Sequence, residues 1–276
     1  MARFEVGREY VRKEIHAQYG GQEQQGISTP AGSNLIFLIT GKSGAAYGYD
    51  DDWEPEGVYR YYGAGRTGHM LMEGPNERVR DHAEDGSELH LFRDLSKGRL
   101  RYEGEMVLAG WKHEDNVPDL NKQGRRAIVF YLAPVDAQSI ADPPATIDGT
   151  APSNLWSMSL ETLREKAQPE RFKVAEAKQA SQNVRERSRA LRVYVLRRAH
   201  GKCEGCDQPA PFTTPNGQPF LEAHHTRRLS DGGPDSPRWV IAVCPNCHRR
   251  AHYASDAETF NDGLKAALAT LEASVP

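Results

Sequence analysis

Short apolar and aromatic runs, separated by turns that contain glycine and aspartate, dominate the first 135 residues. Such runs have the length of β-strands, which usually hold about five or six residues. They lie at residues 35–39, 58–62, 88–92, 105–111 and 127–132. One short helix is expected to interrupt them, from Asn76 to His82. The pattern therefore predicts a first domain built mainly from strands.

The pattern changes after residues 134–152, which are rich in proline, alanine and aspartate and show no periodicity. This composition is typical of an interdomain linker. Ser159 is expected to begin a helix, and Pro169 suits the first turn of a longer one that reaches about Ala199. A final amphipathic helix is expected over residues 257–273.

The length of 276 residues fits two domains of ordinary size, and no apolar run approaches the roughly 20 residues of a membrane helix. Charges at the N-terminus stand where a secretion signal needs an apolar stretch, so we expect a cytoplasmic protein without a membrane partner. We predict an α+β chain with a twisted sheet or barrel at 1–135, a linker and basic helix at 136–187, and a second domain at 188–276.

Positive charge is concentrated in one segment, although the formal net charge is only -3. Residues 164–202 hold 12 lysines and arginines against four glutamates. A basic stripe in an acidic chain is typical of a surface that binds a polyanion. A solvated helix of mixed charge has the same composition and is the alternative. If the segment binds DNA, the candidates for contact with its backbone are Arg185, Arg189 and Arg192.

All four cysteines lie in two Cys-x-x-Cys pairs, Cys203 with Cys206 and Cys244 with Cys247. Two such pairs can complete a tetrahedral sulfur shell around zinc. Two disulfides are the alternative, which the reducing cytoplasm disfavours. Four protein ligands leave no open coordination position, so the sequence predicts a structural zinc ion.

Four histidines fall in the same segment, as the adjacent pair His224 and His225 and the pair His248 and His252. The second pair has the i, i+4 spacing that places both imidazoles on one face of a helix beginning near Asn246. The adjacent pair is expected on a strand, where successive side chains point to opposite sides. One ring can then face a metal ion and the other a substrate.

The run from Leu221 to His252 resembles the HNH, or ββα-metal, nuclease motif in its zinc-stabilised form, and the resemblance covers about residues 188–256. It implies that a catalytic divalent ion, Mg²⁺ or Mn²⁺, is held by His224, His248 and His252. It also implies that His225 is the general base. An imidazole with an unperturbed pKa near 6.5 can deprotonate water at neutral pH.

One residue departs from the HNH pattern. Trp239 stands where the family has its middle asparagine, five residues before the third cysteine. In the family that asparagine orders the loop that carries the base. The departure therefore concerns the loop more than the chemistry, and Asn246 is not assumed to replace the missing residue.

The segment from Gly48 to Gly63, GYDDDWEPEGVYRYYG, combines an acidic loop with aromatic residues. A surface turn followed by an edge strand is one explanation. The other is a base pocket, in which two rings sandwich a flipped base and a carboxylate accepts the cytosine amino hydrogen.

This segment resembles the signature of the SRA domain, a reader of 5-methylcytosine. In that signature Gly-Tyr-acidic-Asp-Asp is followed by Tyr-Thr-Gly, whose glycine lies eleven residues after the last aspartate, and Asp52 and Gly63 keep this spacing. Weaker similarity spans residues 4–133. The resemblance implies that Tyr49 and Tyr61 stack on the flipped base and that Asp52 reads its Watson-Crick edge.

Together the two resemblances imply a modification-dependent restriction endonuclease that flips 5-methylcytosine or 5-hydroxymethylcytosine in double-stranded DNA and cuts nearby. One HNH site cuts one strand, so we expect a homodimer. Two alternatives stay open. One is a non-catalytic sensor of modified DNA, including phosphorothioate DNA, and the other is a general HNH nuclease with an unrelated partner domain.

Overall fold

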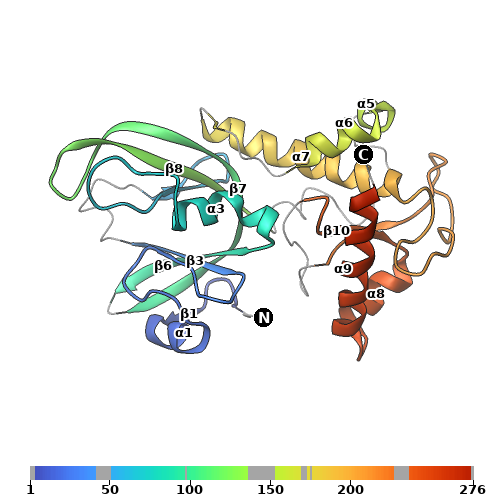
Figure 1. Cartoon of the computed structure of the whole chain (residues 1–276), viewed down its shortest axis with the longest axis horizontal. Coiled ribbons are helices and arrows are strands. Elements are labelled where there is room, and N and C mark those ends of the chain that lie inside the picture. The colour runs from blue at the N-terminus through green and yellow to red at the C-terminus, as the bar shows by residue number, and fades with distance from the viewer. Residues whose placement is uncertain are drawn as a thin grey trace. The chain divides into compact units, whose positions relative to one another are not determined.

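The computed structural model describes residues 4–41, 51–96, 98–135, 153–168, 173–174, 176–226 and 236–274. These residues fall into two compact units (Figure 1). The first unit contains the described residues up to 135 and those of 170–184, and the second contains those of 136–169 and those from 185 onward. No helix among the described residues is long and apolar enough to cross a membrane.

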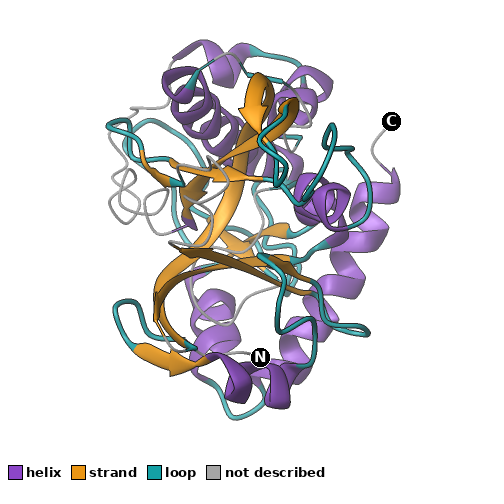
Figure 2. Ribbon diagram, turned by 90° about the vertical axis from the view of Figure 1, so that its left-hand side faces the viewer, coloured by secondary structure: helices purple, strands orange, loops and turns teal. Residues whose placement is uncertain are grey.

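Eight strands of the described chain form one sheet in the first unit (Figures 1 and 2). Their order is β2-β3-β6-β7-β8-β5-β4, with β1 paired to β7, and β3 runs parallel to β6 while the other pairs are antiparallel. The strands span Glu9–Val11 (β1), Ile27–Ser28 (β2), Leu35–Gly41 (β3), Asp52–Trp53 (β4), Tyr59–Tyr62 (β5), Glu88–Ser96 (β6), Arg99–Pro118 (β7) and Gly124–Pro134 (β8).

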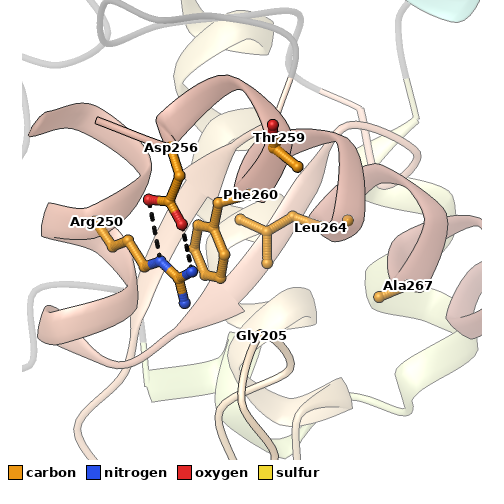
Figure 3. A pocket seen from close by; sticks show the side chains of 8 residues that line it. Gly205, Arg250, Asp256, Thr259, Phe260, Leu264 and Ala267 are labelled. Carbon is orange, nitrogen blue, oxygen red and sulfur yellow. Dashed lines mark hydrogen bonds and ion pairs between the residues drawn. The ribbon is translucent and has the colours of Figure 1, made fainter. Parts of the chain in front are cut away.

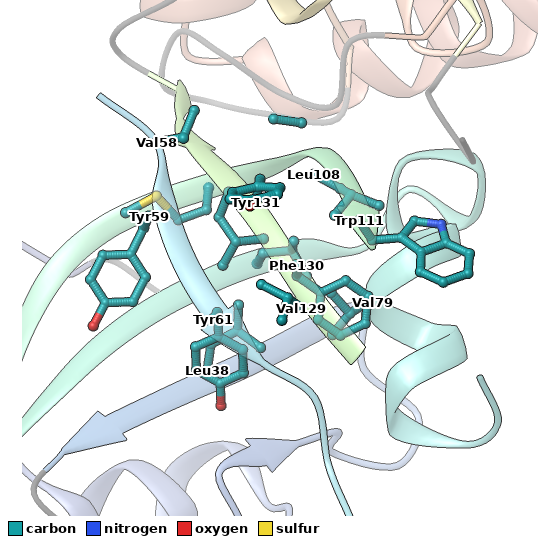
Figure 4. Close-up of a cluster of buried hydrophobic side chains, with 14 of the residues drawn as sticks. Leu38, Val58, Tyr59, Tyr61, Val79, Leu108, Trp111, Val129, Phe130 and Tyr131 are labelled. Carbon is teal, nitrogen blue, oxygen red and sulfur yellow. The ribbon is translucent and has the colours of Figure 1, made fainter. Parts of the chain in front are cut away.

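The five strands expected from the sequence are found as β3, β5, β6, β7 and β8. Strand β5 begins one residue later than expected, at Tyr59, and the other four strands extend beyond the expected segments, β7 most of all. Both faces of the central strands are buried, because alternate side chains of β3 and β6 enter two different apolar clusters. One cluster contains Tyr61 and Phe130, which Figure 4 shows together. The other cluster contains Phe37 and Phe92.

Two helices of the first unit accompany the sheet. Helix α1, Arg12–Tyr19, contributes Ile15 to the cluster around Phe37. Helix α3, Pro75–Asp85, contributes Val79 to the cluster shown in Figure 4. Helix α3 contains the helix expected from Asn76 to His82, and it begins one residue earlier because proline is well suited to the first helical turn.

The second unit contains a short two-stranded sheet surrounded by helices. Ser159 caps the second helix as expected, since its hydroxyl accepts a hydrogen bond from the backbone N–H of Thr162 at 3.1 Å. The elements are α5 (Ser153–Ser157), α6 (Leu160–Ala167), α7 (Ala177–Arg198), β9 (Glu222–His225), β10 (Val240–Val243), α8 (Pro245–Tyr253) and α9 (Ala257–Ser274).

The start of the basic helix differs from the prediction. Helix α7 begins at Ala177, and Pro169 lies outside the described residues. Before the helix, Lys173 forms a β-bridge with Trp111 on β7, and the backbone N–H of Val174 donates to the carbonyl of Trp111 at 2.8 Å. Gly110 permits this approach, because a Cβ at that position would lie 2.6 Å from the side chain of Val174. This tertiary pairing delays the helix, and local sequence preference does not reveal it.

Helix α7 contributes residues to both units. Ala180 and Val184 belong to the core of the first unit, and Leu191 and Tyr194 belong to a core of the second. The linker expected over residues 134–152 lies outside the described residues from 136 onward. The overall composition is α+β, as the sequence predicted.

Candidate functional site

Strands β9 and β10 and helix α8 form a ββα element in the second unit. The two strands are antiparallel, and His224 pairs with Ile241 while His225 pairs with Val240. Helix α8 follows β10 directly, with Cys244 as its N-cap residue and proline in its first turn. The element therefore carries the two sequence-predicted histidine pairs on a strand and a helix that contact each other.

His224, His248 and His252 come together in this element. One ring nitrogen from each residue lies within 4.8 Å of the others. Their ring centroids are 4.9 to 5.1 Å apart. Neutral imidazole nitrogens are common ligands of divalent metals, so the donor set fits a metal ion held by three histidines.

Burial keeps one of these ligands neutral. His224 is 2% exposed, and this desolvation is the main cause that lowers the pKa of its imidazole to about 4. The neighbouring histidines lower the pKa further, while the hydrogen bond with Asn261 raises it. At neutral pH the ring is therefore uncharged and can offer a lone pair to a metal ion.

Two partners of the histidine cluster were not predicted from the sequence. The carboxylate of Glu222 lies 2.7 Å from Nδ1 of His248. The amide oxygen of Asn261, on α9, lies 2.9 Å from Nε2 of His224. Glu222 could have been found by its place two residues before His224 on the same strand face, whereas no local signal marks Asn261.

His225 follows His224 on β9 and its side chain is half-buried. Adjacent strand residues point to opposite faces, so His225 is directed away from the three-histidine cluster. The end of β9 is fastened by the carbonyl of Trp239, which accepts hydrogen bonds from the backbone N–H and the hydroxyl of Thr226. Because a main-chain carbonyl makes this contact, it does not require the asparagine that the HNH pattern places at this position.

The four cysteines form a second cluster, with their sulfur atoms within 4.8 Å of one another and no disulfide. Burial raises the pKa of the Cys203 thiol, but hydrogen bonds from the backbone N–H groups of Cys244, Gly205 and Cys206 outweigh it, so its pKa is lowered. Such donors stabilise a thiolate. Four sulfur donors complete the tetrahedral coordination of a structural zinc ion, so this cluster fits such an ion.

A pocket of about 330 Å³ lies at the corner between α8 and α9 (Figure 3). The guanidinium of Arg250 lies 4.4 Å from the ring centroid of Phe260 and forms an ion pair with Asp256. None of the residues that line this pocket belongs to the histidine or cysteine cluster. The ion pair between Arg250 and Asp256 therefore stabilises the turn between α8 and α9.

The residues expected in the base pocket are only partly described. Tyr49 lies outside the described residues. Asp52 is on β4 with a side chain that is 67% exposed, and Tyr61 is on β5 and 2% exposed. Asp52 pairs with Arg60, the residue before Tyr61, so the side chains of Asp52 and Tyr61 point to opposite faces of the sheet.

Asp51, rather than Asp52, is the aspartate whose carboxylate is hydrogen-bonded to neighbouring strands. Its carboxylate accepts hydrogen bonds from the hydroxyl of Thr40 at 2.9 Å and from the backbone N–H of Tyr62 at 2.8 Å. The hydroxyl of Tyr59 donates to the backbone carbonyl of Asp51 at 3.2 Å. Asp51 thus links β3 to β5 and holds the chain just before β4, a role that the sequence did not indicate.

The basic stripe is smaller on the surface than its composition suggests. Arg185 and Arg189 are exposed and Arg192 is half-buried, and their spacing places them on one face of α7. Arg198 is buried in ion pairs with Glu204 and Glu272, both at 2.7 Å. Its charge is therefore neutralised within the second unit.

The first unit contains a third group of ligand-type side chains, formed by Glu88, His90 and Glu105. All three are buried on β6 and β7. His90 contacts Glu88 through Nε2 at 3.1 Å and the hydroxyl of Tyr102 through Nδ1 at 2.9 Å. Both ring nitrogens of His90 are thus engaged in a hydrogen-bonded chain within the core.

Both units match known protein families. The family model described as "ScoMcrA-like, SRA domain" matches residues 6–151, which is more than half of the chain. The chain belongs to this family. The model described as "HNH endonuclease" matches residues 203–254, so the second unit carries an HNH domain. The predicted combination of an SRA-like domain with an HNH domain is confirmed.

Individual relatives cover the chain to different extents. The "Type IV methyl-directed restriction enzyme EcoKMcrA" of Escherichia coli (strain K12) is 36% identical over 117 residues, which are 42% of this chain and 42% of that protein. The chain therefore matches less than half of the length of this curated relative.

Solved structures share weaker similarity. The match to the structure of the type IV phosphorothioation-dependent restriction endonuclease ScoMcrA includes 98% of this chain and 61% of the ScoMcrA chain, with 24% identity and a TM-score of 0.42. A complex of the SUVH5 SRA domain with hemimethylated CG DNA covers 48% of this chain and 88% of its own, with 18% identity and a TM-score of 0.36.

Proposed function

We propose that this chain is a modification-dependent DNA endonuclease. Its SRA-family domain holds a flipped 5-methylcytosine or 5-hydroxymethylcytosine, and its HNH domain hydrolyses a phosphodiester bond nearby. The observation that carries the proposal is the three-histidine cluster on a ββα element, in one chain with a domain of the SRA family.

The histidines divide the cleavage chemistry between them. His224, His248 and His252 hold Mg²⁺ or Mn²⁺, which when bound supplies electrostatic stabilisation of the charge that develops on the phosphate. His225 takes the proton from the attacking water, because its half-buried imidazole leaves β9 on the face opposite the three-histidine cluster and imidazole is the side chain most often used as a general base. The zinc-binding cysteines hold the start of α8, which carries two of the three ligands.

We assign base recognition to Tyr49, Asp52 and Tyr61, because these residues match the SRA signature in type and spacing. Flipping costs a few kcal/mol, which stacking on two rings at about 1 to 3 kcal/mol per base offsets. Asp52 and Tyr61 point to opposite faces of the β4–β5 pair, so contact of both with one base requires the two-residue strand β4 to rearrange. The side chain of Asp52 is 67% exposed, so this rearrangement moves no buried charge, but it separates the ring of Trp53 from that of Tyr59.

DNA outside the base pocket is contacted by the exposed face of α7. Arg185, Arg189 and Arg192 bind backbone phosphates and position the duplex without reading its sequence. Each phosphate contact that is lost lowers, by about one, the slope of the logarithm of the binding constant against the logarithm of the salt concentration.

A homodimer accounts for cleavage of both strands, because one HNH site cuts one strand at a time. Sedimentation of the protein with a duplex that carries the modification on both strands tests this part of the proposal. A mass that corresponds to two chains per duplex is expected. A mass of one chain in the presence and absence of DNA would contradict it.

The proposed function is tested by cleavage of one duplex prepared with cytosine, 5-methylcytosine, 5-hydroxymethylcytosine or phosphorothioate linkages. Reactions contain Mg²⁺ or Mn²⁺, and the His225→Ala protein is the control. Cutting confined to modified cytosine, and lost in the control, is expected. Equal cutting of all duplexes would indicate a general nuclease. Cutting of phosphorothioate DNA alone would mean that the protein recognises a backbone modification and not a modified cytosine. Binding without cutting would indicate a sensor.

A further inference from the structure

Asn261 occupies a fixed position behind the histidine cluster. It lies on α9, is 4% exposed, and its side-chain nitrogen donates hydrogen bonds to the carbonyls of Ala251 at 2.9 Å and Ala257 at 3.1 Å. An amide group has one side that donates and one that accepts. Two carbonyl acceptors therefore hold the NH₂ group on their side and direct the amide oxygen toward His224.

The orientation of this amide determines where the proton of His224 resides. The amide oxygen of Asn261 lies 2.9 Å from Nε2 of His224 and can only accept a hydrogen bond. Nε2 must then carry the hydrogen, and a neutral imidazole protonated at Nε2 has its lone pair on Nδ1. Nδ1 is thus the nitrogen that His224 offers to a metal ion.

His248 has the opposite arrangement. Its Nδ1 lies 2.7 Å from the carboxylate of Glu222, so Nε2 is the nitrogen left for the metal. The strand ligand and the helix ligand of the cluster thus present different ring nitrogens. Each is oriented by a partner on its far side, a charged one for His248 and a neutral one for His224.

We infer that Asn261 is a positioning residue of the nuclease site, which locks His224 in the tautomer protonated at Nε2 and makes it a ligand through Nδ1. The inference rests on the proposed function, because it assigns a role within the metal site of the HNH domain. Asn261 does not contact the reacting atoms. It acts through His224, and its anchors on Ala251 and Ala257 connect the ligand to the corner between α8 and α9.

The wild-type protein provides the first test, without any substitution. The full chain is labelled with ¹⁵N-histidine and given one molar equivalent of zinc, which the four cysteines bind in preference to the histidines, and it is kept free of other metals. Long-range proton–nitrogen correlation spectra then identify the nitrogen of His224 that carries the hydrogen. The expected result is a single tautomer protonated at Nε2. Protonation at Nδ1, or a mixture of the two tautomers, overturns the inference.

The second test compares two variants at the same helix corner. Asn261→Leu keeps the size of the side chain and removes the acceptor, and it is expected to weaken Mn²⁺ binding about 10- to 100-fold. Asp256→Asn removes the ion pair with Arg250 (Figure 3) without reaching His224, and it is expected to change Mn²⁺ affinity less than threefold. Free Mn²⁺ is measured by electron paramagnetic resonance.

The outcomes separate this inference from the proposed function. An Asn261→Leu protein that folds and binds Mn²⁺ as tightly as the wild type overturns the inference, whatever its cleavage activity. A wild-type protein that binds Mn²⁺ with the expected tautomer but cuts none of the duplexes leaves the positioning role intact and refutes the nuclease. If Asn261→Leu does not fold, the wild-type spectrum decides the question.

Discussion

The carboxylate of Glu222 on β9 lies 2.7 Å from Nδ1 of His248 on α8. Glu222 is two residues before His224, so both side chains leave the strand on the face toward the helix. One strand thus supplies a proposed metal ligand, His224, and the carboxylate that orients a second proposed ligand, His248. The spacing Glu-x-His on the strand and His-x-x-x-His on the helix places these four side chains in contact.

Replacing Glu222 is expected to weaken metal binding. In Glu222→Leu the hydrogen bond that orients His248 is lost, and an affinity loss of about 10- to 100-fold for Mn²⁺ is expected from the loss of such a partner. Isothermal titration of the zinc-loaded protein with Mn²⁺ measures it. Glu258→Leu, at an exposed position of α9, is the matched control. Equal affinities in the two variants would show that Glu222 does not support the metal site.

Arg198 has a structural rather than a DNA-binding role. Its guanidinium is buried between Glu204 and Glu272, whose side chains are 5% and 9% exposed. Arg198→Ala leaves two buried carboxylates without this partner, and a loss of about 3 to 5 kcal/mol in the free energy of unfolding is expected. Urea unfolding followed by circular dichroism measures the change.

The control for Arg198 is an exposed pair in the same segment. Lys202 lies 4.0 Å from Asp207, and both side chains are mostly exposed. Lys202→Ala is expected to change the free energy of unfolding by about 0 to 1 kcal/mol. If Arg198→Ala has as small an effect as Lys202→Ala but weakens DNA binding, then Arg198 belongs to the DNA-binding stripe after all.

Asp51 and Asp52 are adjacent and chemically identical, yet different effects are expected from their replacement. Asp51→Ala removes the acceptor for Thr40 and Tyr62, and a loss of about 1 to 3 kcal/mol in stability is expected because buried donors lose their partner. Asp52→Ala alters an exposed side chain and is expected to change stability by less than about 0.5 kcal/mol.

The base-binding role proposed for Asp52 distinguishes it from Asp51 in a second measurement. Fluorescence anisotropy of labelled duplexes gives the ratio of affinities for 5-methylcytosine and cytosine DNA. Asp52→Ala is expected to lower this ratio toward one at unchanged stability, because the hydrogen bond to the base edge is lost. A ratio that stays at the wild-type value in Asp52→Ala would remove Asp52 from the base pocket.

The sequence reveals those features that depend on neighbouring residues. Strand positions follow from the runs around Phe37 and Phe130, and the shared face of His248 and His252 follows from their spacing. Asn261 could not be predicted, because it is 37 residues from His224 and its helix has an ordinary amphipathic pattern. Arg198 and Arg185 look alike in the sequence, and only the packing of α7 distinguishes the buried side chain from the exposed one.

The free energy of unfolding of the second unit is expected to decrease as the pH is lowered, because of His224. Burial lowers the pKa of its imidazole to about 4, whereas the unfolded chain has a pKa near 6.5. Between these values the unfolded state binds the proton and the folded state does not. The stability that the neutral ring contributes is therefore fully present above pH 6.5 and is lost as pH falls toward 4, by up to about 3 kcal/mol.

The contribution of His224 is isolated by a difference between two proteins. Urea unfolding of the wild type and of His224→Gln, both zinc-loaded and free of other divalent metals, is measured from pH 7.5 to pH 5. Protonation of the four clustered cysteines affects both proteins alike and cancels in the difference. The wild type is expected to lose stability faster than His224→Gln as pH falls. Parallel curves would mean that His224 titrates near its ordinary pKa, and the burial of the ring between β9 and α9 would then not control its protonation.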